Sequence, residues 1–529
     1  MKVFNLVNLI FFISLYVTGY CIPDSDGNEF ITSFLYKDAK NGSNVELNLF
    51  FIPSIQYPSH IEVKYFSLLK NQTVTILVSP KFGELNKLNF IYADVVSEGH
   101  LSTGTALNVI DPRIFISSVT PIKTIASLYD KTNNVGDMYI VPPISFAGTT
   151  YLVKLPKVTI DVNVELITSS GISNTTMSQN FTINGNLGSP QKIISSIFPG
   201  AKKSFYIKAS GPIIITAAAN GADLNGYLSQ PNGKNSINFD YVAYMPQPIG
   251  IWNGKTMLTP KDKRVTFADH TVALEVSPSD VIGYNILPIV TYSNINNSAP
   301  KSSIIPVQKV TEYIIDHSII TEFATQSSHA VAVWTRYGSP NISSNQTLHG
   351  MYIHYIPEST QFYNGVTQFI TKNDGDYFEV YVENYNTNAI MTLNGQNIVF
   401  DNKIAKTLDF FNKTYTVFKI TVPKAGLNTF NSSLKYIAYV VGKMNPNFNT
   451  SYGYLSGFNQ SKLQTYWASD ETSTSAPSTT VTSKNSGSTI NPSTKSATTI
   501  TTTTTKSASK VGIYSSIITF IYIFSSFII

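Results

Sequence analysis

Three stretches decide the fold: Val45–Phe51 reads VELNLFF, Val158–Val164 reads VTIDVNV and Phe378–Val382 reads FEVYV. In each stretch apolar and polar side chains alternate, as in a strand with one face buried and the other in water. Many such runs occupy residues 30–465, separated by Gly, Pro, Asn and Asp, with no long helical period among them. We therefore predict an all-β body of sandwich-like sheets rather than a parallel sheet covered by helices.

Turn residues divide these runs. Asn184-Gly185 and Asn394-Gly395 are candidate hairpin turns, because both central positions of the favoured turn need positive φ. Asp374-Gly375-Asp376 and Asp223–Gly226 (DLNG) are interpreted as turns rather than ion sites, since Asp, Asn and Gly supply turn geometry.

The sequence contains an internal repeat of its strand pattern. Met138–Pro142 (MYIVP), followed by Phe146 and Gly148, resembles Met351–Ile353 (MYI) followed by Pro357, Phe362 and Gly365, and the motif Gly226–Ser229 (GYLS) recurs at Gly453–Ser456. We predict two tandem β-sandwich-like halves, 22–240 and 241–468, each large enough to bury its own core.

The composition argues against nucleic-acid binding and against a chain that is disordered throughout. Of 529 residues, 43% are hydrophobic and only 13% are charged, with 37 basic and 32 acidic side chains giving a net charge of +5. A charge this small and diffuse is not a nucleic-acid footprint, so we expect no nucleic-acid partner. The aromatic and aliphatic content excludes disorder throughout.

The N-terminus predicts secretion. Residues 1–21 combine Lys2, an apolar run and small residues at Gly19 and Cys21, which is the pattern of a cleaved signal peptide. Cys21 is the sole cysteine, so cleavage before Ile22 leaves a mature protein that folds without disulfides, thiolate metal sites or a cysteine nucleophile.

The C-terminus predicts an anchor. Residues 471–510 contain 24 Ser or Thr among 40, so 469–510 is predicted to be an extended stalk, and the apolar residues 511–529 follow as a hydrophobic helix. This order is typical of a glycosylphosphatidylinositol (GPI) signal, and the spacing favours attachment at Ser496. The alternative is a spanning helix, but no basic residue follows the tail as a stop-transfer helix usually requires.

A secreted chain exposes its Asn-x-Ser/Thr motifs to glycosylation, and each occupied one marks a surface position. The eleven acceptors are Asn41, Asn71, Asn174, Asn180, Asn296, Asn341, Asn345, Asn412, Asn431, Asn449 and Asn459.

Candidate chemical residues are few. The acidic cluster Asp24, Asp26, Asn28 and Glu29 carries oxygen ligands that Ca²⁺ prefers, but it lacks the EF-hand spacing and is interpreted as a solvated segment. The seven histidines form no metal motif, and no nucleophile-elbow or phosphate-loop motif is present. We therefore predict no catalytic residue, no metal and no cofactor. Aromatic side chains can stack on sugars, but Trp252, Trp334 and Trp467 are interpreted as core residues. The seven histidines mentioned above are His60, His100, His270, His317, His329, His349 and His354.

The order of strands and turns resembles the IgGFc-binding protein N-terminal domain family. The matching pieces are Gly27–Phe34 (GNEFITSF), Ser118–Ile122 (SVTPI), Pro142, Phe146, Gly148 and Tyr151 in the first half, and Pro357, Leu393–Gly395, Tyr439–Gly442 and Tyr452–Tyr454 in the second. The resemblance covers most of residues 27–460 and implies an extracellular, non-enzymatic binding module. It defines no residue for antibody binding.

These features together predict a glycoprotein on the outer leaflet of the plasma membrane. It would display an adhesive surface towards extracellular glycans or proteins, held clear of the bilayer by the stalk. Two alternatives stay open: a surface hydrolase on a β-scaffold, and a purely structural coat glycoprotein.

Overall fold

The computed structural model shows an all-β protein, as the alternating sequence pattern predicts. The chain divides into two compact units, Met1–Thr474 and Ser475–Ile529, and every described residue belongs to the first. The predicted signal peptide, stalk and C-terminal hydrophobic helix lie outside the described residues. The described residues are 22–36, 44–97, 106–155, 162–168, 172–176, 180–196, 203–223, 239–248, 262–267, 271–278, 286–293, 301–306, 311–314, 322–327, 332–339, 350–398, 406–410, 413–448 and 450–460.

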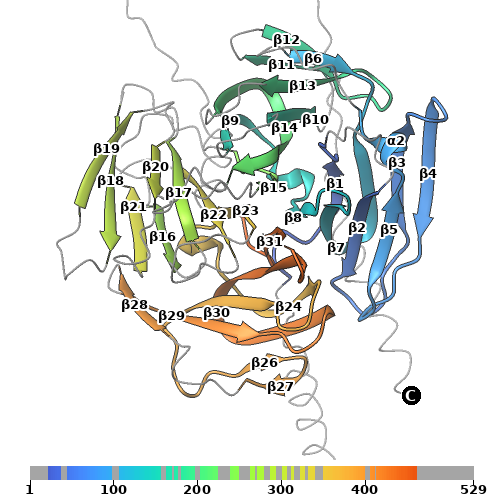
Figure 1. Cartoon of the computed structure of the whole chain (residues 1–529). Helices are drawn as coiled ribbons and strands as arrows, with labels where there is room; N and C mark the ends of the chain where they lie inside the picture. The colour runs from blue at the N-terminus through green and yellow to red at the C-terminus, as the bar shows by residue number, and fades with distance from the viewer. Residues whose placement is uncertain are drawn as a thin grey trace, which may run out of the picture. The chain divides into compact units, whose positions relative to one another are not determined.

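The first two sheets are formed by residues 27–244 (Figure 1). The first is seven-stranded and contains β1 (Gly27–Thr32), β2 (Val45–Pro53), β3 (Ile61–Ser67), β4 (Gln72–Val78), β5 (Asn86–Phe90), β7 (Ile114–Asp130) and β8 (Val135–Val141). The second is eight-stranded and contains β6 (Ala106–Val109), β9 (Gly148–Leu155), β10 (Val162–Thr168), β11 (Ile172–Thr176), β12 (Asn180–Asn184), β13 (Gln191–Ser196), β14 (Lys203–Asp223) and β15 (Phe239–Tyr244).

Three further sheets are formed by residues 262–455. Two are four-stranded: one contains β16 (Asp262–Phe267), β18 (Ile286–Ser293), β19 (Lys301–Pro306) and β21 (Glu322–Ser327), and the other contains β17 (Thr271–Pro278), β20 (Thr311–Ile314), β22 (Ala332–Gly338) and β23 (Tyr352–Ile356). The last is eight-stranded and contains β24 (Tyr363–Thr371), β25 (Tyr377–Glu383), β26 (Met391–Leu393), β27 (Gln396–Asn397), β28 (Lys406–Phe410), β29 (Lys413–Thr421), β30 (Gly426–Asn445) and β31 (Thr450–Leu455).

Helices are short in the described part of the chain. They are α2 (Tyr92–Val95) and the 3₁₀ turns η1 (Ile144–Phe146) and η4 (Ser359–Gln361). η4 begins with a capping box, in which Glu358 accepts from the backbone of the turn and the Gln361 side chain accepts from the Glu358 N–H.

Long strands organise the three largest sheets. β7, β14 and β30 are 17, 21 and 20 residues long, and each pairs with different strands along its two halves. β7, for example, pairs with β1 and β3 near Ile116 and with β2 and β8 near Ala126. All described strand pairs are antiparallel, so every register is set by cross-strand side-chain fit and by turns.

Four strands meet where the sheets converge. β8, β15, β23 and β31 contact one another in a closed circuit, and each pairs with the strand that precedes it in the chain (Figure 1). Nearly all their side chains are buried. Gly453 of β31 lies against the Tyr352 ring, where an added Cβ would stand 2.3 Å from a ring carbon. The absence of a side chain at this position therefore permits the close packing of β23 and β31.

One buried carboxylate ties these four strands together. Asp240 Oδ1 accepts from Gly136 N of β8 at 3.2 Å. Asp240 Oδ2 accepts from Met351 N, directly before β23, and from Ser451 N of β31, at 3.0 Å each. Burial raises the pKa of Asp240 to about 8. A group so placed satisfies backbone donors of three strands that lie about a hundred or more residues apart.

The repeat seen in the sequence has a structural counterpart. Met138–Pro142 and Met351–Ile353 both lie at these inner strands, and each inner strand leads into a 3₁₀ turn (η1 or η4) and then an outer strand (β9 or β24). Gly453–Ser456 lies in and directly after β31, whereas its sequence partner Gly226–Ser229 lies outside the described residues. The boundary between two halves at residue 240 stays a prediction.

Two hydrophobic clusters form the core of the described residues. One gathers side chains from the first sheet and from β14 and β15; the other centres on the last sheet and includes Tyr352 and Phe146. β3 shows how the sequence pattern builds this core: Ile61, Val63 and Tyr65 are buried, and Glu62 and Lys64 between them are half-buried, as the alternation of apolar and polar residues predicts.

The two predicted hairpin turns have different outcomes. Asn394 and Gly395 have φ values of 51° and 77° and connect the paired strands β26 and β27, so this prediction is confirmed. Asn184-Gly185 is not a hairpin turn. β12 and β13 are separated by β11, β14 and β10 in the sheet, and the left-handed position of the connecting loop is Gly188, with φ 83°.

Candidate functional site

A cleft of about 630 Å³ opens at the start of the body. It is formed by the segment before β1, the beginning of β3, the middle of β7, η1 and the last described residue. Its lining residues are Asp24, Asp26, Gly27, Asn28, Glu29, His60, Glu62, Ser117, Ser118, Val119, Pro143, Ile144, Ser145 and Gln460.

The wall of the cleft is the outward face of the first sheet. In one cross-strand row, Glu29 of β1 lies opposite Ser117 of β7, and Ser117 lies opposite Glu62 of β3. The neighbouring residue of each strand faces the core, and Phe30, Ile116 and Ile61 are all at most 2% exposed. The alternation that builds the sheet therefore places two carboxylates on either side of a serine hydroxyl.

The floor of the cleft is closed by a clasp between the two ends of the body. Ser25 N donates to Phe458 O at 2.9 Å, and Phe458 N donates back to Ser25 Oγ at 3.0 Å. Gln460 N donates to Asp24 Oδ2 at 2.8 Å, and Gln460 Nε2 donates to Ser145 O at 3.1 Å. The bonds of Ser25 and Asp24 join residues more than 430 positions apart, which fixes the acidic segment at the cleft, and the Gln460–Ser145 bond joins residues 315 positions apart.

A buried ion pair lies beneath the cleft. Lys123 is 1% exposed, and its Nζ donates to Thr367 Oγ1 at 2.8 Å and to Gln368 O at 2.9 Å, with Asp26 Oδ1 at 3.6 Å. Burial raises the pKa of Asp26 and lowers the pKa of Lys123. The pair links the N-terminal segment and β7 to β24 of the last sheet.

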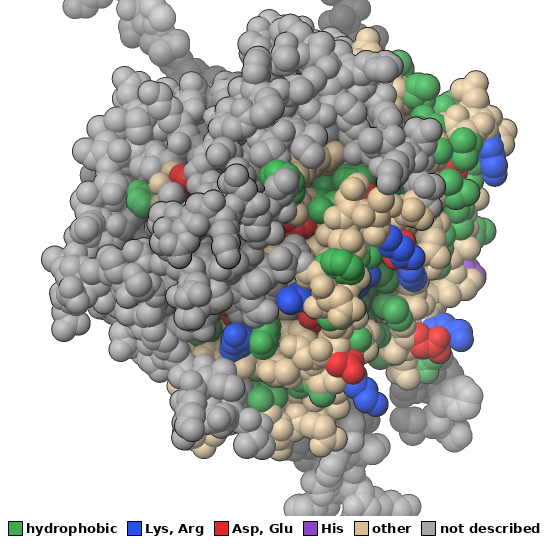
Figure 2. All heavy atoms as spheres, viewed as in Figure 1, with side chains coloured by type: hydrophobic (Ala, Val, Ile, Leu, Met, Phe, Trp, Pro, Cys, Tyr) green, Lys and Arg blue, Asp and Glu red, His purple; other side chains and the backbone are tan. Residues whose placement is uncertain are grey.

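The cleft is acidic. Four carboxylates line it, and His60 is the one lining residue that can carry positive charge. On the described part of the face in Figure 2, acidic and basic side chains are interspersed. An acidic cleft on a chain with net charge +5 is thus a local feature, suited to groups that donate hydrogen bonds or carry positive charge.

The predicted acidic cluster is brought to the cleft, but its oxygens do not converge on one point. Asn28 Nδ2 donates to the carbonyls of Ser118 and Val119, and Asp26 accepts from Ser54 Oγ at 2.8 Å. No group of three or more His, Cys, Asp or Glu side chains among the described residues is placed to hold a metal ion.

Two histidines are described. His354 is buried between the rings of Tyr352 and Tyr439, and burial lowers its pKa to about 3, so it stays neutral and structural. His60 is exposed at the cleft, with Nδ1 at 2.9 Å from Ser79 Oγ. Within the described ranges no third side chain orients its other ring nitrogen, as an activated serine would require.

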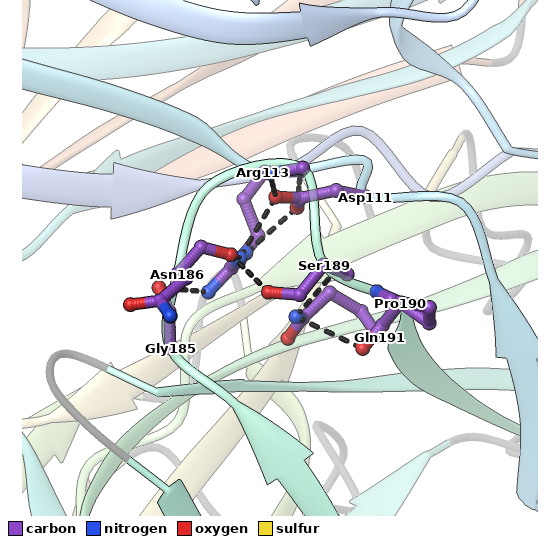
Figure 3. A network of polar contacts seen from close by, with 8 residues as sticks. Asp111, Arg113, Gly185, Asn186, Ser189, Pro190 and Gln191 are labelled. Carbon is purple, nitrogen blue, oxygen red and sulfur yellow. Dashed lines mark hydrogen bonds and ion pairs between the residues drawn. The ribbon is translucent and has the colours of Figure 1, made fainter.

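A second polar network serves the fold. Arg113 is fully buried and donates through Nε and one NH₂ group to both oxygens of Asp111, at 2.7 Å each, and to the carbonyls of Gly185 and Asn186 at 3.0 and 2.7 Å (Figure 3). Its guanidinium also lies 5.0 Å from the centre of the Phe115 ring. Because the Arg113 guanidinium donates both to Asp111 and to carbonyls of the β12–β13 loop, the network holds this loop against the start of β7.

The predicted glycan acceptors fall in different environments. Asn71 is exposed in the β3–β4 turn with φ 51°, while Asn431 and Asn459 are half-buried. The backbones of Asn174 and Asn180 lie in β11 and β12. The remaining acceptors Asn41, Asn296, Asn341, Asn345, Asn412 and Asn449 lie outside the described residues, as do Ser496, Trp252, Trp467, His100, His270, His317, His329 and His349.

No membrane-crossing helix occurs in the part of the chain that the structure describes. Of the three tryptophans, only the backbone of Trp334 is described, and it lies in β22.

Comparison with known proteins gives no relative. No family model matches the chain, and neither does a curated protein or a solved structure. The resemblance to the IgGFc-binding protein N-terminal domain rests on the residues quoted for it and continues as a proposal.

Sequence reasoning found the acidic segment but not the rest of the cleft. Glu62, Ser117 and Gln460 carry no motif and become neighbours only through pairing of β3 with β7 and through the terminal clasp. The one available signal was alternation, which places Glu62 on the outward face of its strand.

Proposed function

We propose that this chain is an extracellular, lipid-anchored glycoprotein that binds a protein partner through the acidic cleft, as a module resembling the IgGFc-binding protein N-terminal domain. The observation that carries the proposal is the cleft itself: about 630 Å³, open to solvent, with Asp24, Glu29 and Glu62 at a rigid sheet. A preformed site on a sheet loses little entropy on binding.

The charge of the cleft favours a basic ligand. A Lys- or Arg-rich segment of an extracellular protein would donate to Glu29 and Glu62, and Ser117 between them offers a neutral hydrogen-bond partner. The smaller adjoining hollow, about 190 Å³, shares Ile144 with the cleft and adds Phe115, and both can contact the apolar parts of such a segment. Many anchored copies would raise the avidity of weak single contacts.

The binding test uses the full-length protein on the surface of expressing cells. Fluorescent Lys- and Arg-rich peptides, acidic peptides and a glycan panel are titrated against the wild type and against Glu29→Gln/Glu62→Gln. We expect saturable binding of basic peptides that weakens at high salt and falls about tenfold or more in the double variant, as expected when charge-assisted bonds are lost.

The matched control is Glu84→Gln, which removes an exposed carboxylate paired with Lys81 outside the cleft. Equal binding by both variants, or saturable binding of neutral glycans only, would refute the basic-ligand proposal. No saturable partner of any kind would favour the structural coat.

The anchor has its own test. Phosphatidylinositol-specific phospholipase C should release the protein from intact cells, and Ser496 should be the residue that carries the lipid. Retention at the surface would instead support a spanning helix.

A further inference from the structure

The predicted glycan acceptor Asn459 stands at the rim of the acidic cleft. It lies between Phe458 and Gln460 in the terminal clasp, and both Gln460 and its bonding partner Asp24 line the cleft. The Asn459 backbone is held on both sides by Gln361: Asn459 N donates to Gln361 O at 2.9 Å, and Gln361 Nε2 donates to Asn459 O at 3.0 Å. These bonds hold the Asn459 backbone at the rim of the cleft.

The side-chain amide of Asn459 bonds to a residue that lines the cleft. Asn459 Oδ1 accepts from Asp24 N at 3.2 Å, and Asn459 Nδ2 makes no hydrogen bond to another described residue. N-glycosylation attaches the sugar at Nδ2 and leaves Oδ1 as an acceptor, so the bond to Asp24 is compatible with an attached glycan. The first sugar would then project beside Asp24.

We propose that a glycan on Asn459 covers the acidic cleft and controls access to it. The glycan is bulky and hydrophilic, and it is tethered at the rim of an open cleft whose lining also includes Val119 and His60. Occupancy of the Asn459-Gln460-Ser461 acceptor would thus divide the protein into a covered and an open form.

Asn71 provides the contrast. It lies in the β3–β4 turn, whereas the cleft is lined by His60 and Glu62 at the opposite end of β3. Five residues of strand separate Glu62 from the turn, roughly 17 Å at the usual rise per residue. A glycan on Asn71 should therefore leave the cleft open.

Access can be measured without knowing the ligand. The mature chain is predicted to lack cysteine, so a single introduced thiol can be labelled selectively. Val119→Cys places the thiol in the cleft, at a residue 86% exposed, and Leu69→Cys places it beside Asn71, at a residue 60% exposed. The readout is the rate of labelling by a maleimide on a bulky polymer, with the full-length protein on glycosylating cells.

Two substitutions remove one acceptor each and leave the asparagine in place. Ser461→Ala abolishes the acceptor at Asn459, and Thr73→Ala abolishes the one at Asn71. We expect Ser461→Ala to raise the labelling rate of Val119→Cys roughly threefold or more by removing a bulky cover, and to leave Leu69→Cys unchanged. Thr73→Ala should leave Val119→Cys unchanged. Trimming the glycans to one sugar with an endoglycosidase should reproduce the effect of Ser461→Ala without any substitution.

The proposal deepens the binding function proposed above, but the labelling experiment does not depend on it. Mass spectrometry of the peptide containing Asn459 establishes occupancy. The proposal that a glycan covers the cleft is refuted if Asn459 carries no glycan. It is also refuted if Asn459 carries one and the removal of that glycan leaves the labelling rate of Val119→Cys unchanged. If labelling responds while no basic peptide binds the open form, the cover stands and the proposed binding function fails.

Discussion

Replacing Arg113 with Met should strongly destabilise the body. The side chain is fully buried and so is Asp111, and two short bonds join them. Arg113→Met leaves the Asp111 carboxylate buried with backbone donors alone, among them Gly188 N at 2.8 Å. Removing one partner of a buried pair costs about 3–5 kcal/mol, because the remaining charge keeps its desolvation penalty. The carbonyls of Gly185 and Asn186 lose their donors as well.

Urea unfolding followed by far-ultraviolet circular dichroism measures this cost. We expect a lower midpoint at an unchanged slope for Arg113→Met, and a smaller loss for Arg113→Lys, which keeps the charge but not the planar fork. The control Lys81→Met breaks an exposed pair with Glu84 and should leave the midpoint unchanged.

A double-mutant cycle tests the mechanism. If the cost comes from an orphaned charge, Asp111→Ala/Arg113→Met should lose at least about 1 kcal/mol less than the sum of the single variants. Additive losses, or a loss below about 1 kcal/mol for Arg113→Met alone, would show that the pair does not act as argued.

Two further predictions concern buried charges. Burial raises the pKa of Asp240 from 3.8 to about 8, so the folded state binds a proton that the unfolded state releases, and stability should fall as the pH rises from about 4 to 8, by up to about 1.4 kcal/mol per pH unit. Asp240→Asn should flatten that slope in urea titrations across this range; an unchanged slope would contradict the assignment. Lys123→Met should cost about 3–5 kcal/mol by leaving Asp26 unpaired, and adding Asp26→Asn should restore part of it in the same assay. A double variant no more stable than Lys123→Met would argue against the pair.

Much of the local structure was predictable. Val45–Phe51 lies within β2 and Phe378–Val382 within β25, both drawn as strands from alternation alone. The Asn394-Gly395 turn was predictable because the strands on either side of it, β26 and β27, pair with each other. Asn184-Gly185 shows the limit: the same dipeptide does not form a hairpin turn, because the strands on either side find different partners and the loop is held by Arg113.

The candidate site was predictable only in part. The sequence drew attention to Asp24, Asp26 and Glu29 because they adjoin in the chain. Glu62 and Gln460 could not be added, since what brings them to the cleft is a strand register and a clasp between residues more than 430 positions apart. The buried ion pairs could not be predicted from the sequence either. Of the three arginines, Arg113 and Arg336 are fully buried in ion pairs, and their burial depends on the tertiary structure.

The residues by themselves determined that this protein is built of strands, because alternation of apolar and polar side chains needs only neighbouring positions to select a half-buried extended chain. Which strands pair, how four inner strands meet around Asp240, and where an acidic cleft opens were decided by the tertiary structure. The physical reason is that strand pairing depends on side-chain fit between distant segments, and that fit is a free energy of the whole assembly rather than of any stretch within it.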